Sequence, residues 1–119
     1  MPLDDTNWVA PATEIDETTT LLIRARALLV RGWCRGTPAR SRLGVQVSPL
    51  SRRAVAWCAG GALFAARLTA SGLDYHRAAA RLIAAIGGVS VADFNDTQET
   101  VEPVLAAFDR AIGAAAFAH

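Results

Sequence analysis

The sequence predicts an all-α protein: a compact bundle of about four helices around a central apolar helix at about residues 51–69, with a small β-hairpin inserted at about residues 37–48. Three observations predict this fold class. The 119 residues are the length of a single domain. Apolar residues recur with a period of 3.6 in several segments. Helical signals vanish between residues 36 and 50, which contain two prolines and an alternating Val45-Gln46-Val47.

The composition excludes several classes of protein. A net charge of +1 excludes a polyelectrolyte, and 52% apolar residues with 19% charged ones exclude wholesale disorder. Two cysteines are too few for a disulfide scaffold. The 25 alanines, twelve arginines and absence of lysine indicate a GC-rich gene of bacterial or phage origin.

The first 18 residues are expected to form an acidic arm that precedes a single helical domain over residues 19–119. The arm has five acids, two prolines and no arginine. It lacks the basic start and apolar run of a secretory signal, so we expect a cytoplasmic protein with free thiols. The longest apolar run, residues 54–66, would span about 20 Å as a helix, which is too short for a bilayer, and we expect no membrane partner.

The first helix is expected to begin after the threonines at 18–20, whose hydroxyls can accept N-terminal N–H groups, and to end near Trp33 or Cys34. Gly44 lies where the hairpin needs a tight reversal. Ser51 can cap the second helix, in which Gly60 and Gly61 each cost roughly 1 kcal/mol relative to alanine. That cost is reasonable if another backbone approaches this pair closely.

Two further helices follow. Asp74 can cap a third helix, which the glycines at 87–88 end, and residues 89–96 are too short and irregular to assign. Thr100 opens the last helix, with Pro103 in its first turn. One face of the third helix is expected to carry Tyr75, Ala79, Leu82 and Ile86, and one face of the last helix Val101, Val104, Leu105, Phe108, Ile112 and Ala115.

Charge is segregated along the chain. Residues 21–81 hold eleven arginines and one acid, whereas five acids lie in residues 1–20 and five more in residues 82–119. The acidic ends can fold over the arginines and neutralise them. Alternatively, the basic segment can bind a nucleic acid or an acidic partner, although no helix-turn-helix, zinc-finger or aromatic stacking pattern supports nucleic-acid binding. The candidate anion-binding residues are Arg24, Arg31, Arg35, Arg40, Arg42, Arg52 and Arg53.

Cys34, Cys58 and His76 are the weak candidates for catalysis. A nucleophilic thiol needs a nearby base and a cation or helix N-terminus. Cys34 is expected at a helix C-terminus and Cys58 inside an apolar helix, so two buried thiols are the simpler interpretation. The spacing of these residues lacks the paired ligands of a structural zinc site, and we expect no metal and no cofactor.

Further residues can line a ligand pocket or serve packing alone. Trp33 and Trp57 can stack on a ligand, although an indole beside a core helix more often packs with its N–H group bonded. Asn95 and Asp96 are expected in a loop, either as an Asx turn or, with Asp93, as a polar corner of a pocket.

Three blocks of sequence resemble one family. These blocks are G-W-C at residues 32–34, A-V-A-W-C-A-G-G-A-L at 54–63, and D-F-N-D at 93–96. Their order is similar to that of domain-of-unknown-function family 6197, which occurs in bacteria and phages. Phe94 stands where the family commonly has tryptophan. The resemblance implies no reaction, and the matching positions are Gly32, Trp33, Cys34, Trp57, Cys58, Gly61, Ala62, Asn95 and Asp96.

The function we expect is a non-enzymatic interaction or regulatory module that binds another protein or a second copy of itself as a homodimer. One alternative is a small-ligand-binding protein or thiol-dependent enzyme with a pocket near Cys34, Cys58, Asn95 and Asp96. The other is nucleic-acid binding through the arginines.

Overall fold

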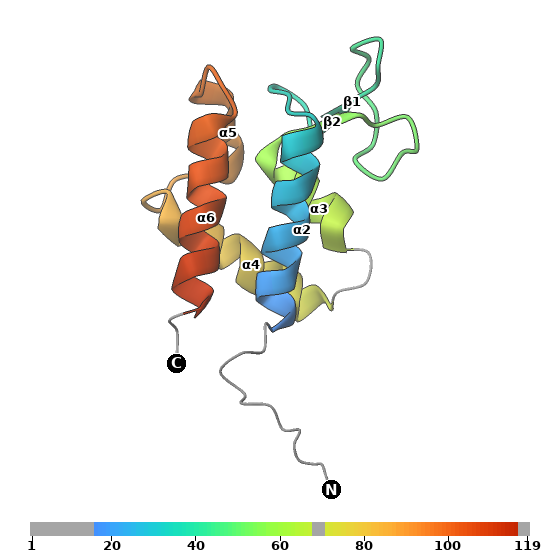
Figure 1. The fold of residues 1–119 in the computed structure, drawn as a ribbon. Helices are drawn as coiled ribbons and strands as arrows, with labels where there is room; N and C mark the ends of the chain where they lie inside the picture. The colour runs from blue at the N-terminus through green and yellow to red at the C-terminus, as the bar shows by residue number, and fades with distance from the viewer. Residues whose placement is uncertain (1–15, 68–70, 117–119) are drawn as a thin grey trace, which may run out of the picture.

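The structure, a computed structural model, describes residues 16–67 and 71–116, which form five helices and two short strands (Figure 1). The predicted mostly helical fold with a small hairpin is confirmed. In chain order the elements are α2 (Glu17–Arg31), β1 (Ala39–Arg40), β2 (Ala56–Trp57), α3 (Ala59–Ala66), α4 (Gly72–Ala85), α5 (Val91–Thr97) and α6 (Glu102–Ala116).

Helix α2, and not the segment 51–69 as the sequence predicts, occupies the centre of the bundle. It packs against α3, α4 and α6, and its apolar face buries residues such as Leu22 and Leu29. Its cap is Asp16, whose carboxylate accepts the Thr19 N–H at 2.8 Å, and not a threonine hydroxyl. The helix therefore begins at Glu17, inside the segment assigned to the arm, and it ends at Arg31. Residues 1–15 of that arm lie outside the described residues.

The predicted helix at 51–69 is wrong in its first half. Helix α3 covers only Ala59–Ala66, and its cap is Cys58, because β2 occupies the residues just before it. Ser51 instead closes a turn by accepting the Arg53 N–H at 3.0 Å. An apolar run without polar alternation fits a buried strand as well as a buried helix, which is why the sequence misled here.

Strand β2 lies between two other extended segments. On one edge it pairs antiparallel with β1, with Ala39 opposite Trp57, and on the other edge Trp57 forms a parallel bridge with Trp33. The hairpin expected at residues 37–48 is present, because the Val47 N–H reaches the Ala39 carbonyl at 3.1 Å. Gly44 makes the reversal with a φ of +82°, a left-handed conformation that favours glycine.

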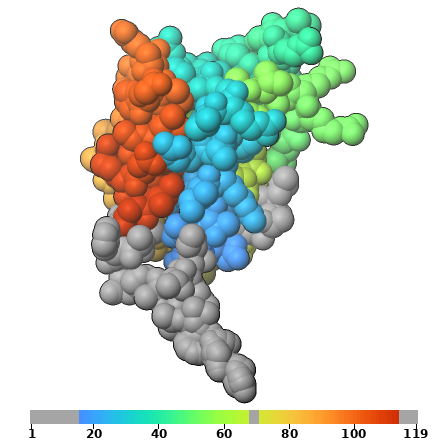
Figure 2. All heavy atoms as spheres, viewed as in Figure 1, coloured from blue at the N-terminus to red at the C-terminus, as the bar shows by residue number. Residues whose placement is uncertain are grey.

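Residues 41–55 form the long connection from β1 to β2, and we call them the groove loop. Figure 1 shows this loop extending away from the helices, and Figure 2 shows the same green segment standing out from the surface. The loop therefore projects from β1 and β2, and β2 is also hydrogen-bonded on its other edge to residues 32–34.

Helix α4 begins with a reciprocal cap in which Ser71, and not Asp74, is the capping residue. The Ser71 hydroxyl accepts the Asp74 N–H at 3.1 Å and donates to the Asp74 carboxylate at 2.9 Å. Thr18 of α2 also donates to this carboxylate, at 3.1 Å. Gly87 and Gly88 end the helix region with φ values of +83° and +87°, as expected of a glycine stop.

Helix α5 forms where the sequence predicted a loop, so Asn95 and Asp96 lie on a helix and not in an Asx turn. Ser90 caps it by accepting the Asp93 N–H at 3.3 Å. Helix α6 confirms its predicted apolar face, on which Val104 and Phe108 are fully buried. The side chain of Ala115 lies outside the described residues.

Candidate functional site

Asn95 is a polar side chain with no exposed surface, and it forms four hydrogen bonds. Its Oδ1 accepts the Trp33 indole N–H at 2.8 Å and the Ala59 backbone N–H at 2.9 Å. Its Nδ2 donates to the Cys34 carbonyl at 3.2 Å and to the Asp96 carboxylate at 3.0 Å. The amide thereby uses both donors and both acceptor sites, so that its burial leaves no polar group without a partner and costs little free energy.

These bonds join the three sequence blocks in space. The first block lies just after α2, the second runs through β2 into α3, and the third lies on α5. We call the set the Asn95 cluster and define it as Trp33, Cys34, Trp57, Cys58, Asn95 and Asp96.

Asp96 fixes the turn that follows the first block. Its carboxylate accepts the Gly36 backbone N–H at 3.0 Å. This bond, together with the Asn95 amide, holds the pKa of the Asp96 carboxyl below its ordinary value. Gly36 has a φ of +80°, so the turn depends on glycine at the position that Asp96 binds.

Both tryptophans of the cluster have their indole N–H groups bonded inside the chain. Trp57 is buried and donates to the Pro49 carbonyl at 3.1 Å, whereas Trp33 donates to Asn95. Arg31 lies over the Trp57 ring and Arg35 over the Trp33 ring, each 5.8 Å from the ring centre. Trp57 thus ties the far side of the groove loop to the sheet.

Two glycines allow the close backbone contacts around the cluster. A Cβ atom at Gly61 would overlap the Pro38 carbonyl, and one at Gly32 would overlap the Val55 carbonyl. The close approach predicted for the glycine pair is therefore real at Gly61. At Gly60 the nearest atom to such a Cβ is the Cys58 sulfur, at 4.0 Å.

The cysteines have different environments. Cys34 is buried, and burial raises the pKa of its thiol to about 11, with the nearby Cys58 thiol acting in the same direction. Cys58 is half-buried at the start of α3, not inside a helix, and its sulfur accepts the Gly61 N–H at 3.2 Å.

Two candidates from the sequence lie apart from the Asn95 cluster. His76 is exposed on α4, with its ring centre 5.7 Å from that of Tyr75. Asp93 is exposed in the first turn of α5. Within residues 16–67 and 71–116, no three histidine, cysteine, aspartate or glutamate side chains gather as metal ligands.

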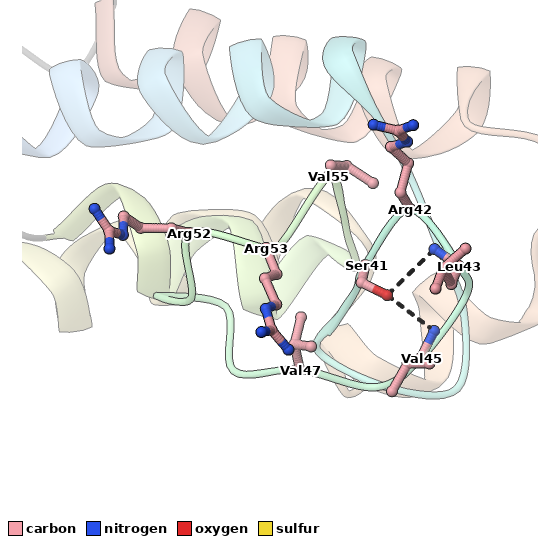
Figure 3. A pocket seen from close by; sticks show the side chains of 8 residues that line it. All are labelled: Ser41, Arg42, Leu43, Val45, Val47, Arg52, Arg53 and Val55. Atoms are coloured by element: carbon pink, nitrogen blue, oxygen red, sulfur yellow. Dashed lines mark hydrogen bonds between the residues drawn. The ribbon is translucent and has the colours of Figure 1, made fainter.

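The residues of the groove loop, 41–55, enclose a groove of about 590 Å³, and no residue of the Asn95 cluster lines it (Figure 3). Its apolar lining is unusually exposed, with Leu43 at 90% and Val45 at 57% of their full exposure. The Ser41 hydroxyl oxygen shapes the tip by accepting the N–H groups of Leu43 and Val45 at 3.3 and 3.2 Å. The lining residues are Ser41, Arg42, Leu43, Val45, Val47, Arg52, Arg53 and Val55.

Three of the seven candidate arginines lie around this groove. Figure 3 shows the side chains of Arg42, Arg52 and Arg53 extending from the loop in separate directions. Among residues 16–67 and 71–116, no carboxylate forms an ion pair with any of the three. The sequence identified these arginines but missed the groove. The aliphatic residues between them, in a loop with no helical period, were the available signal.

The other candidate arginines serve different contacts. Arg35 donates to the Gln98 carbonyl at 2.7 Å, and Arg40 donates to the Gly44 carbonyl at 3.0 Å. Arg24 is exposed on α2. Neutralisation by the acidic ends occurs elsewhere: Asp109 pairs with Arg26 through two bonds of 2.7 and 3.2 Å.

No helix of the described ranges is both long and apolar enough to cross a bilayer. No curated protein and no solved structure significantly matches the chain. A family model described as "Family of unknown function (DUF6197)" does match, over residues 14–114. This match begins before α2, ends within the last turn of α6, and contains both the Asn95 cluster and the groove loop. The chain therefore belongs to this family of unknown function, the same family that its three sequence blocks indicated.

Proposed function

We propose that the protein is a non-enzymatic interaction module whose groove loop binds an acidic, apolar-containing segment of another protein. The observation that carries this proposal is the combination of aliphatic surface with arginines that lack a carboxylate partner among the described residues. Exposed apolar surface rimmed by polar groups is typical of interaction sites. Guanidinium groups around such a surface favour carboxylates on the partner.

The lining chemistry favours a protein partner over a nucleic acid. Single-stranded nucleic acids bind surfaces with aromatic rings on which bases stack, and the groove lining contains no aromatic ring. The indoles of Trp33 and Trp57 are bonded within the fold. Leu43, Val45 and Val55 instead offer contacts that suit aliphatic side chains.

The same lining supports binding without catalysis. Its side chains include no histidine, cysteine, aspartate or glutamate that could act as a base or acid. The Ser41 hydroxyl oxygen already accepts two backbone N–H groups. In the Asn95 cluster, the amide of Asn95 and both indole N–H groups are committed to bonds that hold the fold.

The test measures fluorescence anisotropy with three labelled probes: a peptide of glutamate and leucine, the same peptide with glutamine for glutamate, and an oligothymidylate. We expect the acidic peptide to bind at least ~10-fold tighter than the glutamine peptide, since charge-assisted bonds are lost with the carboxylates. The double variant Arg52→Glu/Arg53→Glu should remove this preference. Arg77→Glu, at an exposed arginine of α4 outside the groove, is the matched control.

Leu43→Ser separates the apolar contribution to binding from the contribution of charge. This variant should bind the acidic peptide several-fold more weakly than the wild type does. Tighter binding of oligothymidylate than of the acidic peptide would replace the proposal with nucleic-acid binding. Equal binding by the double variant and the wild type would overturn the assignment to the groove.

A further inference from the structure

The backbone register places the two cysteines side by side. Trp33 and Trp57 are partners in a parallel bridge, held by bonds from Cys34 N–H to the Trp57 carbonyl and from Trp57 N–H to the Gly32 carbonyl, both 3.1 Å. One residue further along each segment stand Cys34 and Cys58. In a parallel pair such residues are neighbours, and their side chains lie on the same face.

Two other observations support this proximity. The Asn95 side chain bonds the Cys34 carbonyl with one end of its amide and the Ala59 N–H, next to Cys58, with the other. In addition, the Cys58 thiol contributes to the raised pKa of the Cys34 thiol. Neighbouring strands lie about 4.8 Å apart, and disulfides join Cα atoms roughly 4.4–6.8 Å apart. The register therefore suits a bond between the two sulfurs without a large backbone shift.

We propose that Cys34 and Cys58 are an oxidation site, at which a low-molecular-weight disulfide converts the two free thiols into a reversible intrachain disulfide. This inference does not depend on the proposed function. The cysteines are free thiols in this structure, which is the reduced state.

The exchange proceeds in two steps. The half-buried Cys58 thiol loses its proton to solvent, and its sulfur attacks the small disulfide, so that a mixed disulfide forms and one thiolate leaves. The buried Cys34 thiol then loses its proton, and its sulfur attacks the Cys58 sulfur, which expels the second thiolate. Two protein thiols are oxidised, and one small disulfide is reduced to two thiols.

The order of the steps follows from exposure. Cys58 can meet a reagent in solvent, whereas Cys34 is buried and retains its proton at neutral pH because its pKa is about 11. The second step should therefore be slow at pH 7 and accelerate as the pH rises.

The new bond would close a ring from residue 34 to residue 58 that contains the whole groove loop. Both ends of this ring, Cys34 and Cys58, belong to the Asn95 cluster. Oxidation would therefore fix the base of the loop covalently and raise the Tm of the protein.

The test treats the purified protein with oxidised glutathione, blocks remaining thiols by alkylation, and maps peptides by mass spectrometry under non-reducing conditions. We expect a peptide pair linked through Cys34 and Cys58, no glutathione adduct at the end point, and faster linkage at pH 9 than at pH 7. Dithiothreitol should reverse the linkage and lower the Tm again.

Single variants separate the two steps. Cys34→Ala should stop at a stable glutathione adduct on Cys58, whereas Cys58→Ala should react far more slowly. Circular dichroism confirms that each variant is folded. The peptide map of the wild-type protein tests the proposal even if a variant does not fold. A stable adduct on the wild type, a disulfide between two chains, or two thiols that remain free would each overturn the proposal.

Discussion

The indole N–H of Trp33 donates a 2.8 Å hydrogen bond to the side-chain oxygen of Asn95, 62 positions later in the chain. This bond connects the segment after α2 to helix α5. It also explains why a polar residue can occupy a fully buried position, since the second acceptor site of Asn95 receives the Ala59 N–H. We infer that the Asn95 cluster holds the fold together and supports the groove loop, on which we propose that binding occurs.

Removal of the Asn95 amide should destabilise the protein strongly. Asn95→Ala leaves the buried Ala59 N–H and Cys34 carbonyl, and the half-buried Trp33 indole N–H, without their partner. Because each such group costs about 1–3 kcal/mol, we expect a loss of at least about 3 kcal/mol in the free energy of unfolding. Urea denaturation measures it. Ala92→Gln, at an exposed position of the same helix, should change the value by less than about 0.5 kcal/mol.

Gly60 and Gly61 should respond in opposite directions to alanine. At Gly61 the new methyl group would overlap the Pro38 carbonyl, so Gly61→Ala should cost about 2 kcal/mol or more through backbone displacement. At Gly60 there is room, and Gly60→Ala should stabilise α3 by up to about 1 kcal/mol. Thermal unfolding of both variants checks this. A similar loss at the two positions would show that the Pro38 contact is not what requires glycine.

Asp96 should make a pH-dependent contribution to stability. Its folded pKa is depressed by the Gly36 N–H and the Asn95 amide, so this contribution is present above the unfolded pKa of about 3.9 and is lost as the pH falls through the folded pKa. Wild type should therefore exceed Asp96→Asn in stability at pH 7, and the difference should shrink as the pH is lowered toward 3. An NMR titration of the carboxyl group gives the pKa directly. A midpoint at or above 3.9 would contradict this account.

The groove loop should tolerate the substitutions that weaken binding or remove its charge preference. Leu43 is 90% exposed, and Arg52 and Arg53 are exposed as well, so Leu43→Ser and the double charge reversal remove little buried surface. We expect each variant to unfold within about 0.5 kcal/mol of wild type, as is usual for surface changes. Urea denaturation beside the anisotropy measurement checks that any loss of binding is not a loss of fold.

Regular periodicity made much of the fold predictable. The face of α6 that includes Val104 and Phe108 and the glycine stop at residues 87–88 follow from spacing and local conformation, and the structure has both. Residues 54–58 were not predictable in this way. They form a strand and a cap because segments on both sides supply backbone partners, and no local pattern records that pairing.

The candidate site was predictable only in part. The residues around Trp33, Trp57 and Asn95 were recognisable as a set, but their shared hydrogen bonds depend on contacts between segments far apart in the chain. The sequence of α5 does not show that Asn95, one of several polar residues in this helix, will be buried. The groove depends on how the groove loop folds over itself, which involves turns at Ser41 and Gly44 and not a periodic pattern.

The most direct test of this account is an NMR titration of the ¹⁵N-labelled protein with the glutamate–leucine peptide. We expect the largest chemical-shift changes at the amides of Leu43, Val45 and Arg53, with the indole N–H signals of Trp33 and Trp57 nearly unmoved. Changes centred on those indole signals and on the Asn95 amide, with the groove loop unaffected, would contradict the account and place the binding site at the Asn95 cluster.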